Sequence, residues 1–437
     1  MAFTENVRGE WPANESVAGS RPVARPKGKR KRVLSGMRPT GPLHIGHYFG
    51  ALSNWLKLQE EFDCYYFVAD WHALTTHYAD TSQVAQNTMA VAADWLAAGL
   101  DPEKATIFIQ SQVPDHAELH LLLSMVTPLS WLERVPTYKE QIEQLRDKDL
   151  GTYGFLGYPL LQSADIVIYD ADFVPVGEDQ VPHVELTREM VRRFNTAFGP
   201  VNWRKARPKA IAALAKELGL DLAAGDAKSK AAQERVAFAL RPLSLDHRHS
   251  LLANAKVPMA EVLREPQVML TETPRLPGTD GRRMAKSYGN AIWLSDPPEE
   301  VRSKVRNMMT DPQRVRRTDP GRPEVCPVFA FHKLFSDATT VAEVDRDCRT
   351  AAIGCVDCKA RMAEGLVRWI EPIQARRREF AAHPEKVWDI LDAGSAKARR
   401  AAKRTMKRVR EAIFGWERAR AGSANSAGTT KRVATGD

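Results

Sequence analysis

The sequence predicts an α/β protein with a doubly wound parallel sheet, followed by an α-helical C-terminal domain. Short apolar runs at Val33–Ser35, Cys64–Asp70 and Ala105–Gln110 have the length of buried strands, and longer segments of helical spacing such as Gln83–Ala97 separate them. This alternation is typical of parallel sheets whose ligands bind at the carboxyl ends of the strands. From Asp296 onward the spacing is helical throughout.

Length and composition indicate a soluble protein of two or three domains. The chain has 437 residues, of which 43% are hydrophobic, which is enough for a large core. No apolar run approaches the roughly 20 residues that a membrane span needs, and the N-terminus lacks the apolar segment of a signal peptide. We therefore expect a cytoplasmic protein with no membrane partner.

The basic residues are concentrated at the two ends of the chain. Residues 1–32 have a net charge of +5, residues 397–437 one of +9, and residues 33–396 one of −5. Basic ends of this kind are typical of flexible arms, or of a helix, that bind a polyanion. Residues 1–32 lack any period and are predicted to be a disordered arm, either a solvated tail or an RNA contact. Residues 421–437 are predicted to be a disordered tail.

The first motif follows the strand Val33–Ser35 and reads G-M-R-P-T-G-P-L-H-I-G-H. Turn residues give way to helical spacing at Leu43, so His44 and His47 share one face of a first helical turn. Gly46 removes a side chain where a flat group must come close. Free N–H groups add positive potential, which predicts a phosphate site. Half of a metal site and ordinary surface histidines are the competing interpretations.

The letters H-I-G-H after P-T-G-x-L resemble the nucleotide signature of class I aminoacyl-tRNA synthetases. In that family the histidines meet the phosphates of ATP and the glycine lies under adenine. The resemblance implies a Rossmann-like catalytic domain.

A second block runs from Tyr158 to Asn195. Its first segment is a helix that places Asp165 on an otherwise apolar surface, and a buried carboxylate needs a partner. A strand, Phe173–Val176, leads into the turn Gly177–Gln180 and a further helix. The combined pattern A-D-I-x-x-Y-x-A-x-x-V-P-V-G-E-D-Q-x-x-H-x-E-L-T-R resembles the tryptophanyl-tRNA synthetases, and the tyrosyl relatives carry other residues around their D-Q turn.

The third motif comes after residues 203–262, which are predicted to be a helical insertion of unknown role. Leu276–Ser287 resembles the second class I signature, K-M-S-K-S, with Arg283 in place of its first Lys and Ala285 in place of its first Ser. The chemistry needs a mobile cationic loop that closes on pyrophosphate, and Gly281 and Gly289 flank the segment. A basic surface loop is the alternative interpretation.

The resemblance implies ATP-dependent ligation of L-tryptophan to tRNA(Trp) through tryptophanyl adenylate, with Mg²⁺ and a homodimer. It implies four catalytic residues, which are His44, His47, Lys286 and Ser287. It implies ATP contacts at Arg38, Pro39, Thr40, Gly46, His47, Gly177, Glu178, Asp179, Leu276, Arg283, Met284, Ala285, Lys286 and Ser287. It implies that tryptophan is held by Asp165, Tyr158, His72, Val174 and Val176.

Two other classes of function stay open. A small-molecule nucleotidyltransferase could use the H-x-G-H turn on the same fold, although it would not need the Gly177–Gln180 block. A catalytically silent RNA-binding relative could keep the fold, although the intact His44, His47 and Lys286 argue against it.

The C-terminal region contains one basic helix and most of the cysteines. Ala396–Arg420 is amphipathic, and its basic face is either a solvated surface or a contact for an RNA backbone. Four cysteines follow the spacing C-x21-C-x6-C-x2-C and are Cys326, Cys348, Cys355 and Cys358. They are either unrelated core cysteines or a tetrahedral site for Zn²⁺ or an iron–sulfur cluster. Some bacterial tryptophanyl-tRNA synthetases carry a [4Fe-4S] cluster at nearly this spacing, with the first gap one residue longer, and this resemblance favours the cluster.

The predicted domains are a disordered arm at 1–32, a Rossmann-like catalytic domain at 33–295 with the insertion at about 203–262, a tRNA-binding α-helical domain with the four-cysteine site at 296–420, and a tail at 421–437.

Overall fold

The structure is a computed structural model that describes residues 30–135, 151–271, 276–417 and 420. Most of the predicted N-terminal arm and the whole predicted tail at 421–437 lie outside these residues. Contacts divide the chain into two compact units, and the described part of the smaller one is Arg193–Val262. The larger unit contains the described residues of 27–192 and 263–437. The predicted boundary at residue 296 thus falls inside the larger unit, where α/β architecture changes to helices.

A parallel sheet of five strands forms the centre of the larger unit, in the order β3-β2-β1-β4-β5. The predicted fold class is therefore confirmed. Leu34 pairs with Tyr65 and Tyr65 with Thr106, and these strands are buried on both faces, as parallel strands between helices are. The strands are β1 (Arg32–Met37), β2 (Asp63–Val68), β3 (Ala105–Ile109), β4 (Phe173–Val176) and β5 (Gln267–Leu270).

The strand β5 was not predicted from the sequence. It is a short edge strand with no fully buried residue, and it pairs with β4 from Phe173↔Gln267 to Val176↔Leu270. A half-exposed segment of four residues lacks the apolar run that marks β1 to β3. The order of strands reverses between β1 and β4, which makes the gap between them the switch point where ligands of such sheets bind.

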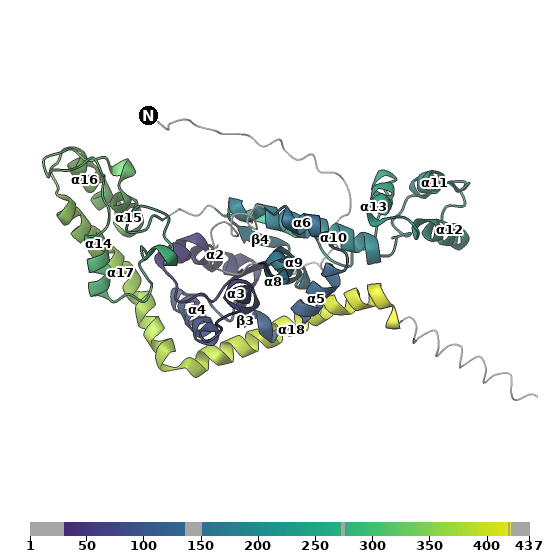
Figure 1. The fold of residues 1–437 in the computed structure, drawn as a ribbon, viewed down its shortest axis with the longest axis horizontal. Helices are drawn as coiled ribbons and strands as arrows, with labels where there is room; N and C mark the ends of the chain where they lie inside the picture. Colours follow the sequence, from purple (N-terminus) through teal and green to yellow (C-terminus); the bar gives the residue numbers. More distant parts are fainter. Residues whose placement is uncertain (1–29, 136–150, 272–275, 418–419, 421–437) are drawn as a thin grey trace, which may run out of the picture. The chain divides into compact units, whose positions relative to one another are not determined.

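Helices cover the sheet in the larger unit (Figure 1). The segment after the first motif begins as α1 (Ile45–His47), continues through a π-helical turn at Tyr48–Leu52 and ends as α2 (Ser53–Glu61). The strand β2 ends at Val68, so Asp70 starts a helix where the sequence predicted the polar end of a strand. The further helices before the insertion are α3 (Asp70–His77), α4 (Val84–Ala98), α5 (Asp115–Ser124), α6 (Leu129–Glu133), α8 (Tyr153–Leu156), α9 (Tyr158–Ile168) and α10 (Val181–Phe198), with 3₁₀ turns at Gln110–Gln112 and Glu178–Gln180.

The chain after the sheet is helical, as predicted. Its helices are α14 (Pro298–Arg306), α15 (Pro327–Phe335), α16 (Ala338–Arg349), α17 (Cys355–Ala382) and α18 (Pro384–Phe414), with 3₁₀ turns at Lys286–Tyr288 and Pro323–Val325. In the part of the chain that the structure describes, no helix combines the length and the apolar character that a membrane crossing requires.

The last helix, α18, runs along the edge strand β3 (Figure 1). A Cβ atom at Gly394 would lie 1.8 Å from the carbonyl oxygen of Ile107, so only glycine permits this approach. The backbone N–H of Ile109 donates to Ser395 Oγ at 3.4 Å. The helix therefore covers an edge that would otherwise present unpaired backbone groups.

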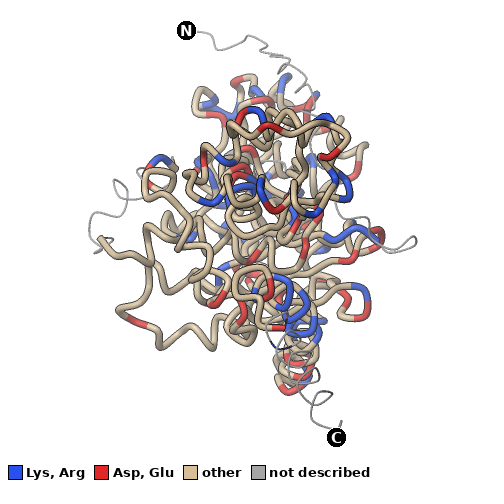
Figure 2. The backbone as a smooth tube through the Cα atoms, turned by 90° about the vertical axis from the view of Figure 1, so that its right-hand side faces the viewer, with Lys and Arg blue, Asp and Glu red and all other residues tan. Residues whose placement is uncertain are grey.

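The amphipathic helix predicted at Ala396–Arg420 is the C-terminal part of α18, which begins earlier, at Pro384. The predicted apolar face is buried at Ala398, Ala402, Met406 and Val409. Two cations of this helix form ion pairs with earlier parts of the same unit: Arg408 pairs with Asp170, and Arg410 pairs with Glu118. Lysines and arginines recur along this helix, shown in blue towards the C-terminus in Figure 2. Part of the predicted RNA-binding strip therefore attaches the helix to its own fold.

The smaller unit is helical and has its own core. Its helices are α11 (Pro208–Glu217), α12 (Lys230–Leu240) and α13 (Leu245–Asn254), together with the end of α10. Apolar residues from all three helices, including Ile211, Val236 and Leu252, are buried together. The insertion predicted at residues 203–262 is therefore helical, as its apolar periodicity indicated.

Candidate active site

The first motif forms a tight turn after β1, in which each of the two histidines accepts a hydrogen bond from the backbone of the other. The backbone N–H of His47 donates to His44 Nδ1 at 3.3 Å, and that of His44 donates to His47 Nδ1 at 3.2 Å. The two rings stack with their centroids 3.6 Å apart. Since each Nδ1 accepts from the backbone, each neutral ring carries its proton on Nε2.

Both histidines are neutral near pH 7. Burial, reinforced by the Lys286 ammonium and Arg283, lowers the pKa of His44 to about 4. Burial, followed by His44 and Lys286, lowers the pKa of His47 to about 3. The pair therefore offers Nε2–H donors without positive charge, and charge for a phosphate must come from other residues.

Gly46 leaves room for the ring of His44. A Cβ atom at this position would lie 2.9 Å from His44 Nδ1, so a side chain would displace the histidine ring. Met284 of the second signature is buried nearby, with its Sδ 3.5 Å from the same point. The two signatures are therefore neighbours at this glycine.

The first signature is anchored by a carboxylate that the sequence analysis did not single out. Asp94 of α4 is fully buried; its Oδ2 accepts from the Leu43 N–H at 2.8 Å and its Oδ1 from Arg377 Nε at 2.6 Å. Burial raises the pKa of Asp94, and the Arg377 guanidinium opposes this rise. A further backbone bond joins the Ile45 N–H to the carbonyl of Ile292, which follows the second signature. The turn is therefore held from two sides.

The second signature is shaped by Asn290, another residue missed at the sequence level. Its Oδ1 accepts from the Ala285 N–H at 2.9 Å, and its Nδ2 donates to the Arg283 carbonyl at 3.0 Å and to Asp280 Oδ1 at 2.7 Å. Gly289 has a φ of 63°, a conformation that side chains rarely adopt. The loop is thereby curled around one buried amide.

Lys286 reaches from the second signature to the first. Its Nζ donates to the Gly41 carbonyl at 2.9 Å and lies 5.7 Å from the centroid of the Trp293 ring. Burial lowers the pKa of Lys286 to about 8, and Asp94 opposes this shift. The ammonium therefore lies beside the predicted phosphate site, while Arg283 and Ser287 of the same loop are exposed.

A cavity of about 310 Å³ lies at the switch point between β1 and β4. Four of the five predicted tryptophan contacts line it, whereas His72 does not. Backbone at Gly36 and Gly50, together with Phe67 and Gln162, completes much of its wall. The predicted contacts that line it are Tyr158, Asp165, Val174 and Val176.

Asp165 is the buried polar group of this cavity, with 1% of its surface exposed. Its carboxylate contacts His72 Nε2 at 2.8 Å and His116 Nδ1 at 2.5 Å, and it accepts from Gln110 Nε2 at 2.8 and 2.9 Å. Burial alone would raise its pKa, but His116 and His72 overcome burial and lower the pKa. Asp165 is therefore ionised near neutral pH, and His72 positions it from behind.

His116 and Gln110 were not identified from the sequence. His116 bridges Asp165 and the Tyr169 hydroxyl, which lies 2.6 Å from His116 Nε2. Within the described chain, Gln110 Oε1 and His72 Nδ1 are buried without a hydrogen-bond partner. These neighbours of Asp165 keep a bonding capacity that a substrate group or a water molecule can satisfy.

The remaining predicted ATP contacts lie at the carboxyl ends of β1 and β4. Arg38, Pro39 and Thr40 follow β1, and Thr40 Oγ1 lies 3.5 Å from Lys286 Nζ. Gly177 caps the 3₁₀ turn after β4 and lines the cavity, while Glu178 is exposed. The side chain of Asp179 lies outside the described residues. Parallel strands thus bring these turns to one edge of the sheet.

Two signatures, joined through Lys286 and placed beside a carboxylate-lined cavity, match one known family. The chain matches the family of class I tRNA synthetases (W and Y) over residues 26–238 and 249–370. The chain belongs to this family.

Individual members of the family resemble the chain over most of its length. A tryptophan–tRNA ligase of Ralstonia nicotianae is 50% identical over 392 residues, covering 88% of this chain and 98% of the relative. A tryptophan–tRNA ligase of Thermotoga maritima is 46% identical over 384 residues, covering 87% and 98%. The crystal structure of Campylobacter jejuni tryptophanyl-tRNA synthetase complexed with ADP and tryptophan is 28% identical, with a TM-score of 0.68, and covers 87% of this chain and 99% of that one.

The four cysteines of this synthetase lie on neighbouring elements. Cys326 precedes α15, Cys348 lies in the last turn of α16, and Cys355 and Cys358 begin α17. Burial, and then the negative charge of the other three sulfurs, raises the pKa of Cys358 to about 12. Among the described residues, no three His, Cys, Asp or Glu side chains meet in a geometry that holds a single metal ion.

A buried arginine lies beside these thiols. The Nη1 of Arg314 donates to Cys348 Sγ at 3.7 Å, and its Nη2 donates to the Ile353 carbonyl at 2.7 Å. Its Nε is buried and has no hydrogen-bond partner in the described chain. The guanidinium therefore places a positive charge beside the Cys348 thiol.

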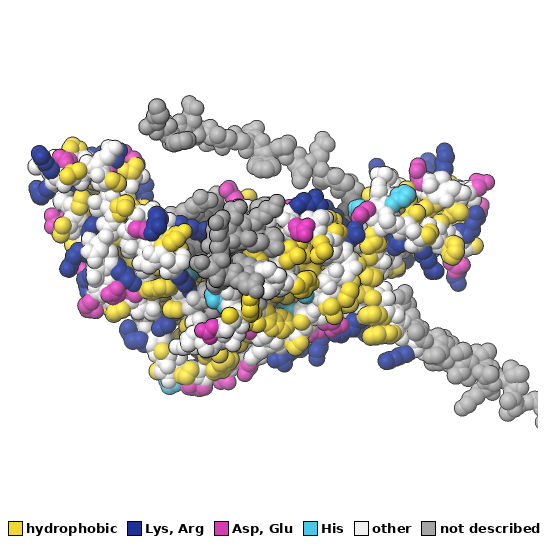
Figure 3. Space-filling model, in the orientation of Figure 1, with side chains coloured by type: hydrophobic (Ala, Val, Ile, Leu, Met, Phe, Trp, Pro, Cys, Tyr) yellow, Lys and Arg dark blue, Asp and Glu magenta, His cyan; other side chains and the backbone are white. Residues whose placement is uncertain are grey.

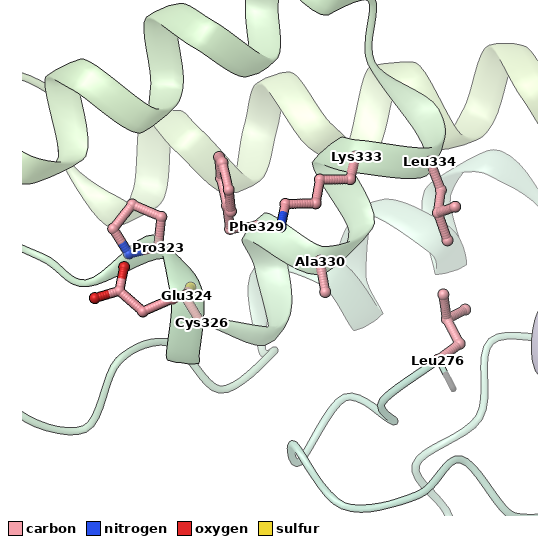
Figure 4. A pocket seen from close by; sticks show the side chains of 8 residues that line it. All are labelled: Leu276, Pro323, Glu324, Cys326, Phe329, Ala330, Lys333 and Leu334. Carbon is pink, nitrogen blue, oxygen red and sulfur yellow. The ribbon is translucent and has the colours of Figure 1, made fainter. Parts of the chain in front are cut away.

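Leu276, a predicted ATP contact, is buried where the chain enters the second signature, and it faces the C-terminal helices. It lines a cavity of about 250 Å³ that α15 bounds on the other side through Phe329, Ala330 and Lys333 (Figure 4). Cys326 lies at the same cavity. The segment that leads into the second signature is therefore packed next to the cysteine-bearing region.

Proposed function

We propose that the protein ligates L-tryptophan to tRNA(Trp) with ATP, through tryptophanyl adenylate, and releases AMP and pyrophosphate. The observation that carries this proposal is the cavity at the switch point, which is lined by a buried and ionised Asp165. We expect this carboxylate to accept an indole N–H. The names of the relatives, tryptophan–tRNA ligases, support the same substrate. The family generally uses ATP and Mg²⁺.

The reaction requires positioning and charge stabilisation more than covalent work. The tryptophan carboxylate attacks the α-phosphorus of ATP, the bond to the β-phosphate oxygen breaks, and pyrophosphate leaves. A hydroxyl of the terminal tRNA adenosine then attacks the carbonyl of the adenylate, and AMP leaves. Mg²⁺, when bound to the nucleotide, supplies further positive charge at the phosphates.

The residues divide this work by chemistry. His44 and His47 are neutral, so they orient phosphate oxygens by donating Nε2–H bonds. Lys286 and Arg283 supply the charge that the leaving pyrophosphate needs. Ser287 is placed on the same loop as a hydroxyl donor, and Gly46 leaves room for the adenine ring.

Pyrophosphate exchange with each amino acid in turn tests the proposal. We expect labelled pyrophosphate to enter ATP with tryptophan and not with phenylalanine or tyrosine. No exchange with tryptophan would contradict the proposed function. Exchange that needs no amino acid would indicate a small-molecule nucleotidyltransferase instead. A homodimer and a cytoplasmic location are further parts of the proposal, and light scattering of the purified protein tests the first.

We further propose that Cys326, Cys348, Cys355 and Cys358 bind a [4Fe-4S] cluster, with Zn²⁺ as the alternative. The four thiolates of such a cluster bind four different irons, so their sulfurs lie farther apart than those around one zinc ion. The four cysteines lie at the ends of neighbouring helices, which supports one shared site. The cluster would brace the start of α17 against α15 and α16, a structural role.

Anaerobically purified protein should be brown and should contain about four iron and four sulfide ions per chain, because four cysteines ligate a cubane cluster. Cys355→Ser should lose the colour and most of the iron. The control is Cys64→Ala, which removes the buried cysteine of β2 and should keep both. Colourless protein with one zinc per chain would show that the site binds zinc and not a cluster. Metal-free protein whose four thiols can all be alkylated would contradict both the cluster and the zinc site.

A further inference from the structure

The smaller unit, Arg193–Val262, has no part in the chemistry proposed above. Its three helices enclose a core of their own, built around residues such as Leu214, Val236 and Leu240. A shared core fixes the positions of the three helices relative to one another. Any role of this unit must therefore be found on its surface.

The charge of this unit is opposite to that of the chain around it. Residues 193–262 contain twelve Lys and Arg against six Asp and Glu, a net charge of +6. Residues 33–192 and 263–396 together contain 31 Lys and Arg against 42 Asp and Glu, a net charge of −11. Lysine and arginine side chains are visible around α11, α12 and α13 in Figure 3. A net charge of +6 on this unit attracts a polyanion.

Four of these cations lie close together in the sequence and are all exposed. They surround the start of α11 and are Arg204, Lys205, Arg207 and Lys209. In the described part of this unit, ion pairs join Arg193 to Asp246 and Lys230 to Glu234, and none involves these four cations. Their charge is therefore available to a ligand.

An aromatic side chain on α12 lies between two arginines. Phe238 is 73% exposed, and Arg235 and Arg241 lie three residues before and after it, on the same helix face. Both arginines are exposed as well. An exposed ring flanked by guanidinium groups is the arrangement on which unpaired nucleobases stack.

We propose that Arg193–Val262 is an RNA-binding module that contacts the tRNA substrate. The cations at the start of α11 bind backbone phosphates, and Phe238 stacks on an unpaired base. This inference rests on the proposed function, because it takes tRNA as the polyanion. It assigns a role to an insertion that the aminoacylation chemistry does not need.

A protein partner suits the same surface less well. Protein interfaces are depleted in lysine at their core and bury a contiguous apolar patch. Among the large apolar side chains of this unit that the structure describes, Phe238 is the one that is prominently exposed. A single ring between two arginines is a small apolar contact for a protein and a sufficient one for a nucleobase.

Charge removal in the full-length protein tests the phosphate contacts. The variant Arg204→Ala/Lys205→Ala/Arg207→Ala/Lys209→Ala should bind tRNA(Trp) about tenfold more weakly or worse, with a slope of log Kd against log salt that is smaller by up to about 3. The matched control Arg204→Lys/Lys205→Arg/Arg207→Lys/Lys209→Arg keeps the charge and should keep both. Pyrophosphate exchange with tryptophan should be unchanged in both variants, which separates this inference from the proposed function.

Substitution of Phe238 tests the stacking contact. Phe238→Leu should raise Kd for tRNA roughly tenfold, whereas Phe238→Trp should bind as tightly as the original protein, because only a flat ring stacks on a base. Equal binding by the leucine variant would overturn the stacking contact, and an unchanged salt slope in the four-alanine variant would overturn the phosphate contacts. A change in oligomeric state with unchanged tRNA binding would make this surface a contact between protein chains instead.

Discussion

Replacing Asp165 by alanine should lower kcat/KM for tryptophan activation by a factor of about a hundred or more. The loss corresponds to a charge-assisted hydrogen bond worth roughly 3 kcal/mol. The carboxylate is ionised and 1% exposed, so this bond forms away from bulk solvent. Pyrophosphate exchange at varied tryptophan concentration measures the effect.

The control for Asp165 must separate recognition from folding, since His116, His72 and Gln110 would lose their shared partner. Asp165→Asn keeps the shape of the side chain, and a thermal unfolding curve reports any loss of structure. A tryptophan analogue with sulfur in place of the indole N–H should be activated about a hundredfold less well than tryptophan by the original protein. The variants should discriminate much less between the two substrates. Undiminished discrimination in a folded variant would show that Asp165 is only structural.

Replacing Lys286 by alanine should lower kcat for adenylate formation roughly a hundredfold while changing the KM for ATP much less. The ammonium lies 2.9 Å from the Gly41 carbonyl, beside the predicted phosphate site, and we expect it to meet the charge that develops on the departing pyrophosphate. An interaction gained mainly in the transition state is expressed in kcat. Single-turnover measurement of adenylate formation reports it directly.

The matched control for Lys286 is Arg282→Ala, which removes a cation from the same loop. Arg282 is 63% exposed and pairs with Asp280, and we expect little loss of activity. The pH profile adds a second readout. Burial lowers the pKa of Lys286 to about 8, so kcat/KM for ATP should fall as the pH rises through that value and the ammonium becomes neutral. Lys286→Arg should abolish this fall. An unchanged alkaline limb in that variant would assign the titration to another group.

The sequence by itself determined the features whose causes are local. Buried strands such as β1 and β2 are recognisable as short apolar runs. The turns at Gly41 and Gly289 need positive φ angles, which glycine adopts readily. The positions of the two signatures, the cysteine spacing and the charge of each segment are also present in the order of residues. For this reason the α/β class follows from the sequence, whereas the predicted tryptophan contacts came from the resemblance to the tryptophanyl-tRNA synthetases, and four of the five line the cavity.

Only the tertiary structure decided which distant residues serve these motifs. Nothing near Asp165 in the chain points to His116 or Gln110, because the hydrogen bonds that join them to the carboxylate cross 49 and 55 residues. Asp94 holds the Leu43 N–H across 51 residues for the same reason.

Which strands form the edges of the sheet, and what covers them, also depends on tertiary packing and not on the local pattern of apolar residues. The strand β5 has no buried apolar run to mark it, and β3 is covered by α18 through Gly394, whose role depends on an Ile107 carbonyl far away in sequence. Periodicity reveals which face of a segment is apolar, but the partner of that face is chosen by the fold, since burial rewards any complementary apolar surface.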